Sequence, residues 1–146
     1  MSLRGKICAL DLGARRVGVA LSDELGMLAH PRGTIDARSE PALLAALTDL
    51  ARDEDVARFV VGLPLDMKGG EGDAARKARA LAQKIADRTG RNVELWDERL
   101  TTVEASKRLA AGEVRGKKAR KHVDEVAATL ILQAWLDRRG GTEGER

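Results

Sequence analysis

Short runs of apolar residues at the start of the chain predict three β-strands. Residues 6–13 (KICALDLG) and 16–23 (RVGVALSD) are β-type runs separated by a turn that contains glycine, and residues 32–36 (RGTID) follow a proline. Strands this close in sequence pair most simply as antiparallel neighbours. The pattern therefore predicts that the chain begins with a three-stranded meander.

From Pro41 onward the pattern changes to alternating helices and strands. A proline is typical of the first turn of a helix, and the leucines after Pro41 lie on one side of such a helix. Residues 58–65 (RFVVGLPL) form a continuous apolar run, as expected for a strand buried on both faces. The remaining pattern predicts a helix at residues 74–90 that ends at Gly90, a strand at 92–98, a helix at 101–112 and a final helix at 123–139.

This order of elements predicts an α/β protein with a mixed five-stranded sheet, made of the three-strand antiparallel meander plus two parallel strands and flanked by helices. The length of 146 residues suits one compact domain, which we place at residues 1–138, with a disordered tail at residues 139–146. The sequence has no apolar run long enough for a membrane span and no secretory signal at its start. We therefore expect a cytoplasmic protein without membrane association.

Composition adds a hint about the binding partner. Lys and Arg together number 26 against 23 for Asp and Glu, and the pI of about 9.3 admits a polyanionic partner. The chain has 2 Trp, 1 Phe and no Tyr, which is too few for an aromatic platform that stacks single-stranded bases. Contacts to phosphates and to nucleic-acid shape should then dominate. The single cysteine, Cys8, lies in a strand-like run and is interpreted as a small buried apolar residue.

Two aspartates stand out because they occur in apolar patterns. On the first strand Ile7, Ala9 and Asp11 share one face, so Asp11 continues a buried row unless the strand has already ended, in which case it is a turn aspartate. On the final helix Asp124 shares a stripe with later Ala, Ile and Trp residues, whereas Glu125 lies on the polar side. Asp124 is therefore expected to face inward.

The strand at residues 92–98 ends in two acidic residues, Asp97 and Glu98. Alternation places them on opposite faces of the strand, and periodicity does not choose between them. If the strands that hold Asp11, Gly62 and Glu98 run parallel, their carboxyl ends lie on one rim of the sheet. Open α/β sheets generally bind their ligands at that rim.

Four stretches of the chain, read in order, resemble a known family. DLGARRVGVALSD, VVGLPLDMKG, DERLTTVEA and HVDEVAATLIL are similar to the motifs of the YqgF/RuvX family, which comprises pre-16S rRNA nucleases and Holliday-junction-resolvase-like proteins with an RNase H fold. The resemblance spans nearly the whole chain. It implies that the acidic site residues are Asp11, Glu98 and Asp124. The related resolvases carry a fourth carboxylate shortly before the last aspartate, where this chain has KARKH.

Three carboxylates on one rim indicate a site for divalent metal. Two carboxylates about 4 Å apart repel each other by on the order of 4 kcal/mol at an effective dielectric constant of 20, so a bound cation is strongly favoured. Mg²⁺ and Mn²⁺ prefer carboxylate oxygens, and such ions support phosphodiester hydrolysis by activating water and relieving charge on the leaving oxygen. We expect Asp11, Glu98 and Asp124 to serve as metal ligands and as catalytic residues.

Basic residues lie beside two of these motifs. Arg15 and Arg16 follow the first aspartate and either hold phosphate or simply lie on a turn. A basic segment at residues 113–122, which the pattern predicts to be a loop, comes directly before Asp124 and is expected to contact the nucleic-acid backbone. The residues expected to bind nucleic acid are Arg15, Arg16, Arg115, Lys117, Lys118, Arg120 and Lys121.

Two further residues are accessory candidates. Thr101 and Glu104 have the spacing of a capping box, which favours a structural cap over a catalytic hydroxyl at Thr101. His122 could carry a proton, but a surface histidine at a helix start is the simpler interpretation.

The sequence thus predicts a metal-dependent endonuclease for structured nucleic acid, and the resemblance makes pre-16S rRNA the first substrate to consider. A branched DNA junction is the alternative, with the same chemistry. Two other classes are less favoured: a non-catalytic nucleic-acid-binding module, and a fragment of a sugar-kinase or actin-like ATPase, which normally requires two such domains. We expect nucleic acid as the partner, no membrane contact, and leave a homodimer open.

Overall fold

The fold is built on a five-stranded mixed sheet. The computed structural model describes residues 5–101 and 117–144, and in the last helix it describes the side chains of residues 123–139. The strands are β1 (Lys6–Leu12), β2 (Arg16–Ser22), β3 (Ala29–Asp36), β4 (Val56–Leu63) and β5 (Asn92–Asp97). Their order in the sheet is β3-β2-β1-β4-β5, with β1, β2 and β3 antiparallel and with β4 and β5 parallel to β1. This arrangement confirms the predicted meander with two parallel strands.

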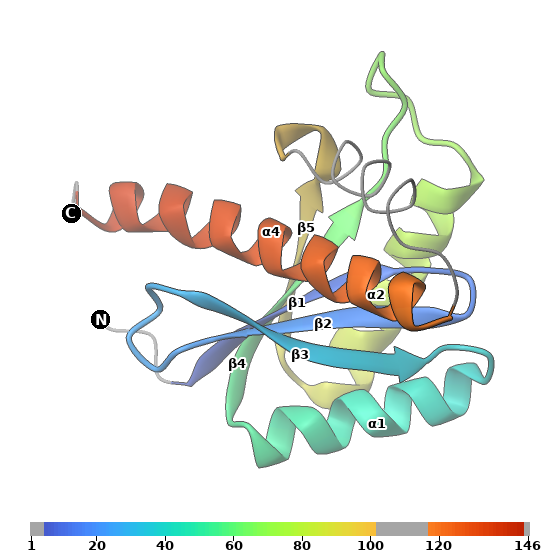
Figure 1. The fold of residues 1–146 in the computed structure, drawn as a ribbon, viewed down its shortest axis with the longest axis horizontal. Helices are drawn as coiled ribbons and strands as arrows, with labels where there is room; N and C mark the ends of the chain where they lie inside the picture. The colour runs from blue at the N-terminus through green and yellow to red at the C-terminus, as the bar shows by residue number, and fades with distance from the viewer. Residues whose placement is uncertain (1–4, 102–116, 145–146) are drawn as a thin grey trace.

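Helices cover both faces of the sheet. α1 (Glu40–Asp53) and α2 (Asp73–Thr89) pack together on one face, and α4 (Lys117–Gly144) crosses the other, as Figure 1 shows. A short 3₁₀ helix, η1 (Glu98–Leu100), follows β5. None of the helices in the described part of the chain contains an apolar stretch of the length that a bilayer requires.

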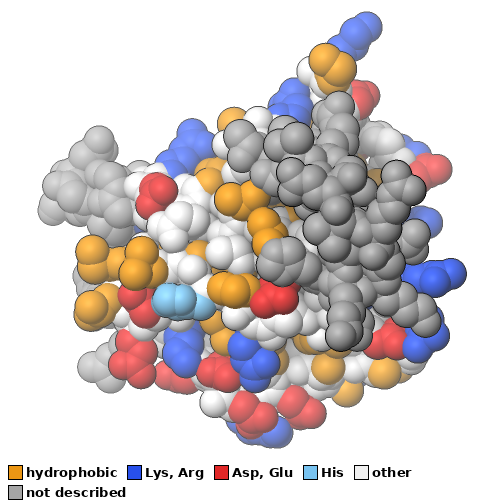
Figure 2. Space-filling view, in the orientation of Figure 1, with side chains coloured by type: hydrophobic (Ala, Val, Ile, Leu, Met, Phe, Trp, Pro, Cys, Tyr) orange, Lys and Arg blue, Asp and Glu red, His pale blue; other side chains and the backbone are white. Residues whose placement is uncertain are grey.

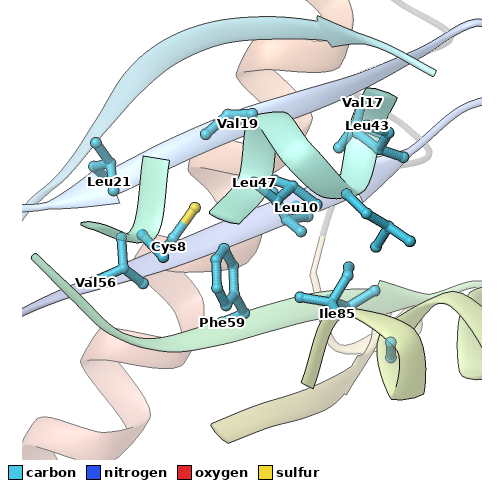
Figure 3. Packing of buried hydrophobic residues seen from close by; sticks show 14 residues of the cluster. Cys8, Leu10, Val17, Val19, Leu21, Leu43, Leu47, Val56, Phe59 and Ile85 are labelled. Atoms are coloured by element: carbon cyan, nitrogen blue, oxygen red, sulfur yellow. The ribbon is translucent and has the colours of Figure 1, made fainter. Parts of the chain in front are cut away.

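The core under α1 and α2 is aliphatic around one aromatic ring. Phe59 of β4 is fully buried there with Leu10, Leu47 and Ile85, which come from β1, α1 and α2 (Figure 3). Cys8 is also fully buried in this layer, and burial raises the pKa of its thiol well above the ordinary value. The interpretation of Cys8 as an apolar core residue is therefore confirmed.

The core under α4 includes two alanines at the centre of the sheet. Ala9 and Ala20 of the sheet are fully buried against Ile131 and Leu132 of α4. Small side chains on β1 and β2 let a helix backbone approach the sheet closely, which matters for the position of the residues at the start of α4.

One strand boundary differs from the prediction. β3 begins at Ala29, whereas the sequence predicts a strand only after Pro31. Proline is tolerated in this strand because β3 lies at the edge of the sheet and its pairing with β2 is irregular between Val19 and Ala20.

The boundaries of the last helix also differ. α4 begins at Lys117, so residues 117–122 are helical and do not form the predicted loop. Lys, Arg and Ala, which make up most of KKARKH, are strong helix formers even without an apolar stripe. The helix continues to Gly144, within the segment predicted to be a tail. Residues 102–112 of the predicted helix at 101–112, and residues 145–146 of that tail, lie outside the described residues.

Candidate active site

Asp11 is buried near the carboxyl end of the central strand. Its exposed fraction is 1%, and it shares with Ile7 and Ala9 the face of β1 that α4 covers, as the alternation predicts. Asp11 pairs with Gly18 on β2. On β4, Val61 pairs with Leu10, so Gly62 is the neighbour of Asp11 on the other side. The aspartate therefore has a glycine beside it on both neighbouring strands.

Gly62 makes room for Glu98. A methyl group at position 62 would come within 2.7 Å of Oε1 of Glu98, 3.2 Å of its Cγ and 2.9 Å of Cδ1 of Ile131. The side chain of Glu98, which is 8% exposed, therefore lies over β4 in the space that any other residue at position 62 would fill. Glu98 thus reaches across the sheet toward the strand that carries Asp11.

Asp97, in contrast to Glu98, stabilises the turn after β5. Its carboxylate caps η1 by accepting a hydrogen bond from the backbone N–H of Arg99 at 2.9 Å. It also accepts two from the Arg99 guanidinium, from Nε at 3.0 Å and from Nη2 at 2.7 Å. These side-chain bonds hold the pKa of Asp97 below its ordinary value. Of the two neighbouring acids that periodicity could not separate, Glu98 is the one buried against the sheet.

Gly18 makes room for the α4 backbone at Asp124. The backbone carbonyl of Asp124 lies so close to the α-carbon of Gly18 that a side chain there would overlap it. The stripe that follows is buried as predicted, with Ala127 and Ala128 at 1% and 0% exposure. Asp124 is thus placed over the residue that pairs directly with Asp11.

The carboxylate of Asp124 forms an ion pair with Arg16. Nε of Arg16 lies 4.0 Å from Oδ2 of Asp124, and the two side chains are only 15% and 21% exposed. Arg16, which the sequence predicts to bind phosphate, is therefore turned toward the last helix, whereas Arg15 is exposed on the turn. The pair connects the beginning of β2 with α4.

The donor chemistry of this region fits a hard divalent cation, because Asp11 is a buried carboxylate and Gly62, on the neighbouring strand, leaves room for the carboxylate of Glu98. Among the residues with described side chains, however, no three Asp, Glu, His or Cys form a ready-made metal site. Oδ2 of Asp124 lies beside Arg16 at the beginning of β2, so a cation bound by this carboxylate would compete with the ion pair.

The accessory candidates are only partly described. The hydroxyl of Thr101 donates a hydrogen bond to the backbone carbonyl of Glu98 at 2.9 Å and so closes the turn after β5, which is a structural role. Glu104 and Arg115 lie outside the described residues. The backbones of Lys117, Lys118, Arg120, Lys121 and His122 form the first turns of α4, before Asp124, but their side chains are outside the described part.

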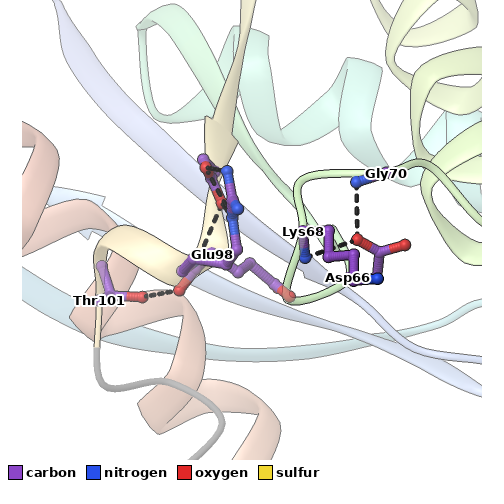
Figure 4. A network of polar contacts seen from close by, with 7 residues as sticks. Asp66, Lys68, Gly70, Glu98 and Thr101 are labelled. Atoms are coloured by element: carbon purple, nitrogen blue, oxygen red, sulfur yellow. Dashed lines mark hydrogen bonds and ion pairs between the residues drawn. The ribbon is translucent and has the colours of Figure 1, made fainter.

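The structure contains an ordered turn after β4 that was not predicted from the sequence. Oδ1 of Asp66 accepts hydrogen bonds from the backbone N–H groups of Lys68 at 2.9 Å and Gly70 at 2.7 Å. Figure 4 shows this turn next to the turn that carries Glu98. An Asp four residues before a glycine is a signal for such a turn, because its side chain can satisfy nearby backbone N–H groups.

Comparison with known proteins gives a consistent picture. The chain matches the RuvX family, described as Holliday junction resolvase, over residues 5–138. A relative from Anaeromyxobacter dehalogenans strain 2CP-C is 48% identical over 130 residues, which cover 89% of this chain and 95% of the relative. A relative from Symbiobacterium thermophilum is 42% identical over 140 residues, covering 96% and 97% of the two chains. Both relatives carry the name "Putative pre-16S rRNA nuclease".

Solved structures share the fold at low sequence identity. RuvC from T. thermophilus in complex with a Holliday junction substrate aligns with a TM-score of 0.59 and 13% identity, covering 95% of this chain and 98% of that one. A second Thermus thermophilus RuvC structure gives a TM-score of 0.56 at 12% identity, with 94% and 97% coverage. The likeness confirms the RNase H-like arrangement of the sheet and helices.

Proposed function

This chain belongs to the RuvX family, and we propose that it is a metal-dependent endonuclease that hydrolyses phosphodiester bonds in structured nucleic acid. The observation that carries this proposal is the pair of glycines on either side of Asp11. Gly62 admits the carboxylate of Glu98 and Gly18 admits the backbone of Asp124, so the elements that carry the three acids meet around Asp11. Burying carboxylates lowers the stability of the folded protein, and buried acids of this kind are typical of catalytic and metal-binding sites.

Each acid would hold the metal in its own way. Asp11 is fixed by the central strand, Glu98 lies over Gly62, and Asp124 would exchange its contact with Arg16 for the cation. When bound, Mg²⁺ or Mn²⁺ activates water and relieves charge on the phosphate. The guanidinium of Arg16, released from Asp124, would then be available to orient a phosphate oxygen of the substrate.

We infer that the substrate is a ribosomal RNA precursor, because the relatives that match over nearly their whole length bear the name of a pre-16S rRNA nuclease. The proposed location is the cytoplasm, where ribosomal RNA of bacteria is processed. A branched DNA junction is the second candidate, favoured by the description of the family and by the fold shared with RuvC. In either case Arg15 and the basic residues at the start of α4 would contact phosphates.

The test compares cleavage of a pre-16S rRNA fragment and of a four-way DNA junction, each with Mg²⁺, with Mn²⁺ and with excess chelator. We expect cleavage only with metal, and a loss of at least about a hundredfold for Asp11→Asn. The substrate with the higher kcat/KM identifies the physiological class. Full cleavage in chelator, or an Asp11→Asn protein as active as the parent in a preparation free of host nuclease, would refute the proposal.

Two neighbouring carboxylates provide a matched comparison. Glu98→Gln should abolish cleavage because it removes a charged metal ligand, whereas Asp97→Asn should lower it far less because Asp97 contacts Arg99 and caps η1. Equal losses in the two variants would mean that Glu98 has no special role in the chemistry.

A further inference from the structure

Met67 is an apolar side chain presented to solvent at the active-site end of the molecule. It is 97% exposed, in the segment that extends past the carboxyl end of β4, where Figure 1 shows a projection above the strands. Lys68, the next residue, is exposed as well. Figure 2 shows a hydrophobic and a basic side chain together at the tip of this projection.

The turn that carries Met67 is held by its own hydrogen bonds. Besides the two bonds to the Asp66 carboxylate, the N–H of Asp66 donates to the carbonyl of Gly70 at 3.0 Å, and the N–H of Gly69 donates to the carbonyl of Asp66 at 2.9 Å. Gly69 has a φ of +87°, which suits glycine. A turn ordered before binding loses little further entropy when it meets a ligand.

The turn is also positioned relative to the candidate active site. The guanidinium of Arg99 packs on Gly69, where a methyl group would lie 3.3 Å from Nη1. Arg99 is in turn oriented by its bonds to Asp97. Because Asp97 and Arg99 flank Glu98 in sequence, the turn that carries Met67 is a direct neighbour of the turn that carries Glu98, as Figure 4 shows for the two turns.

The surroundings favour nucleic acid as the ligand. Phe59, Trp96 and Trp135 are the only aromatics of the chain and are 0%, 7% and 3% exposed, so none of them can stack on a base. Apolar side chains, methionine included, can instead enter between base steps, and neighbouring cations contact the backbone. Lys68 follows Met67 on the same turn and is exposed, and Arg99 lies against Gly69 of that turn.

We propose that Met67 is a wedge that contacts an unstacked base of the substrate, while Lys68 binds the adjacent phosphate. This inference rests on the proposed nuclease function. The feature of the substrate that Met67 would recognise is a base step whose two bases are already unstacked. A continuous duplex offers no such gap, because separating its bases costs a few kcal/mol per step.

The test uses an RNA stem with one unpaired 2-aminopurine and the same stem fully paired, both in Ca²⁺ to limit cleavage. Wild-type protein should bind the stem with the unpaired base more tightly and raise the fluorescence of 2-aminopurine. Met67→Ala should reduce this preference on the order of tenfold and abolish the fluorescence increase, and Met67→Leu should restore both. Because Met67 is exposed, these substitutions leave the core untouched.

Met27 provides the matched control. It is 65% exposed on the turn between β2 and β3, at the opposite end of the sheet from the carboxyl end of β1, so Met27→Ala should behave as wild type. If Met67→Ala keeps the preference and the fluorescence change, the wedge is refuted while the nuclease proposal stands. If the wild-type protein binds neither RNA, the wedge is refuted and the RNA substrate with it, and the cleavage assay with a DNA junction then decides the nuclease function.

Discussion

The carbonyl group of Asp124 lies directly over Gly18, so the last helix touches the second strand through backbone alone at this point. A single methyl group on Gly18 would overlap the helix backbone, which cannot move aside as a flexible side chain can. The close approach of α4 to the sheet near the candidate active site therefore requires a residue without a side chain at position 18.

Gly18→Ala should destabilise the protein, because α4 must shift as a body to accept the methyl group. We expect the free energy of unfolding to fall by about 1–3 kcal/mol in urea titrations. If Gly18→Ala is as stable as the wild-type protein, the approach of Asp124 to Gly18 is not as tight as described.

Gly62→Ala should affect activity more than stability. The methyl group would displace the side-chain ends of Glu98 and Ile131, which can shift more easily than backbone, whereas the strand itself can stay in place. We expect cleavage to fall by on the order of ten- to a hundredfold while the variant remains folded by circular dichroism. Wild-type kcat/KM in this variant would show that Glu98 need not lie over β4.

Arg16→Gln should increase the affinity for metal. The guanidinium competes with a cation for the Asp124 carboxylate, so its removal should tighten Mn²⁺ binding several-fold, equivalent to about 1 kcal/mol, in isothermal titration calorimetry. Arg15→Gln is the neighbouring control, because Arg15 is exposed on the turn. Unchanged affinity in the Arg16 variant would argue that Asp124 does not leave its ion pair to bind metal.

The pair formed by Asp97 and Arg99 should make the free energy of unfolding depend on pH in the acidic range. Hydrogen bonds from Arg99 lower the pKa of Asp97 in the folded protein below its unfolded value. The stabilisation is therefore present above the unfolded pKa and is lost as the pH falls through the lower folded pKa. In Arg99→Gln, the Asp97 carboxyl should titrate nearer to 3.8 by NMR. A titration identical to wild type would remove Arg99 as the cause, and Arg88→Gln on α2 is the control.

The basic residues at the start of α4 should contribute affinity without sequence preference. Replacing Lys117, Lys118, Arg120 and Lys121 together by Ala retains helix-forming residues, and should weaken binding to RNA and DNA alike. For each phosphate that the variant no longer neutralises, the slope of log K against log salt should flatten by about 0.7–0.9. Replacing Lys77, Arg79, Lys84 and Arg88 of α2 together by Ala removes the same number of charges and controls for their general loss. A quadruple variant with wild-type affinity and slope would show that this part of α4 is an ordinary solvated surface.

Much of the fold follows from local patterns. The apolar runs of β1, β2 and β4 locate the middle of the sheet, and Pro41 and Gly90 mark helix ends that the structure confirms. The start of α4 could not be placed in this way, because the apolar stripe that indicates this helix begins only near Val123. The basic turns before it are helical through the propensity of Lys, Arg and Ala.

The acidic residues were predictable as single positions, but their surroundings were not. Alternation on β1 correctly places Asp11 on the buried face. The stripe on α4 predicts an inward Asp124, but its side chain is 21% exposed and pairs with Arg16, and Glu125 is half-buried as well. The choice of Glu98 over Asp97 needed the resemblance, because the distinction depends on contact with Gly62. A glycine inside an apolar strand signals close approach of another group, but the identity of that group depends on tertiary packing.

The order in which the chain supplies the acids has a consequence for its folding. Asp11 belongs to the first strand, Glu98 follows the fifth, and Asp124 arrives with the final helix, which also covers Ala9 and Ala20 of the strands made first. Residues 1–100 can therefore supply every strand of the sheet and still lack one of the three acids. If Asp124 holds metal, the proposed site is complete only once α4 has packed on the sheet, so folding of the last helix and assembly of the site are one event.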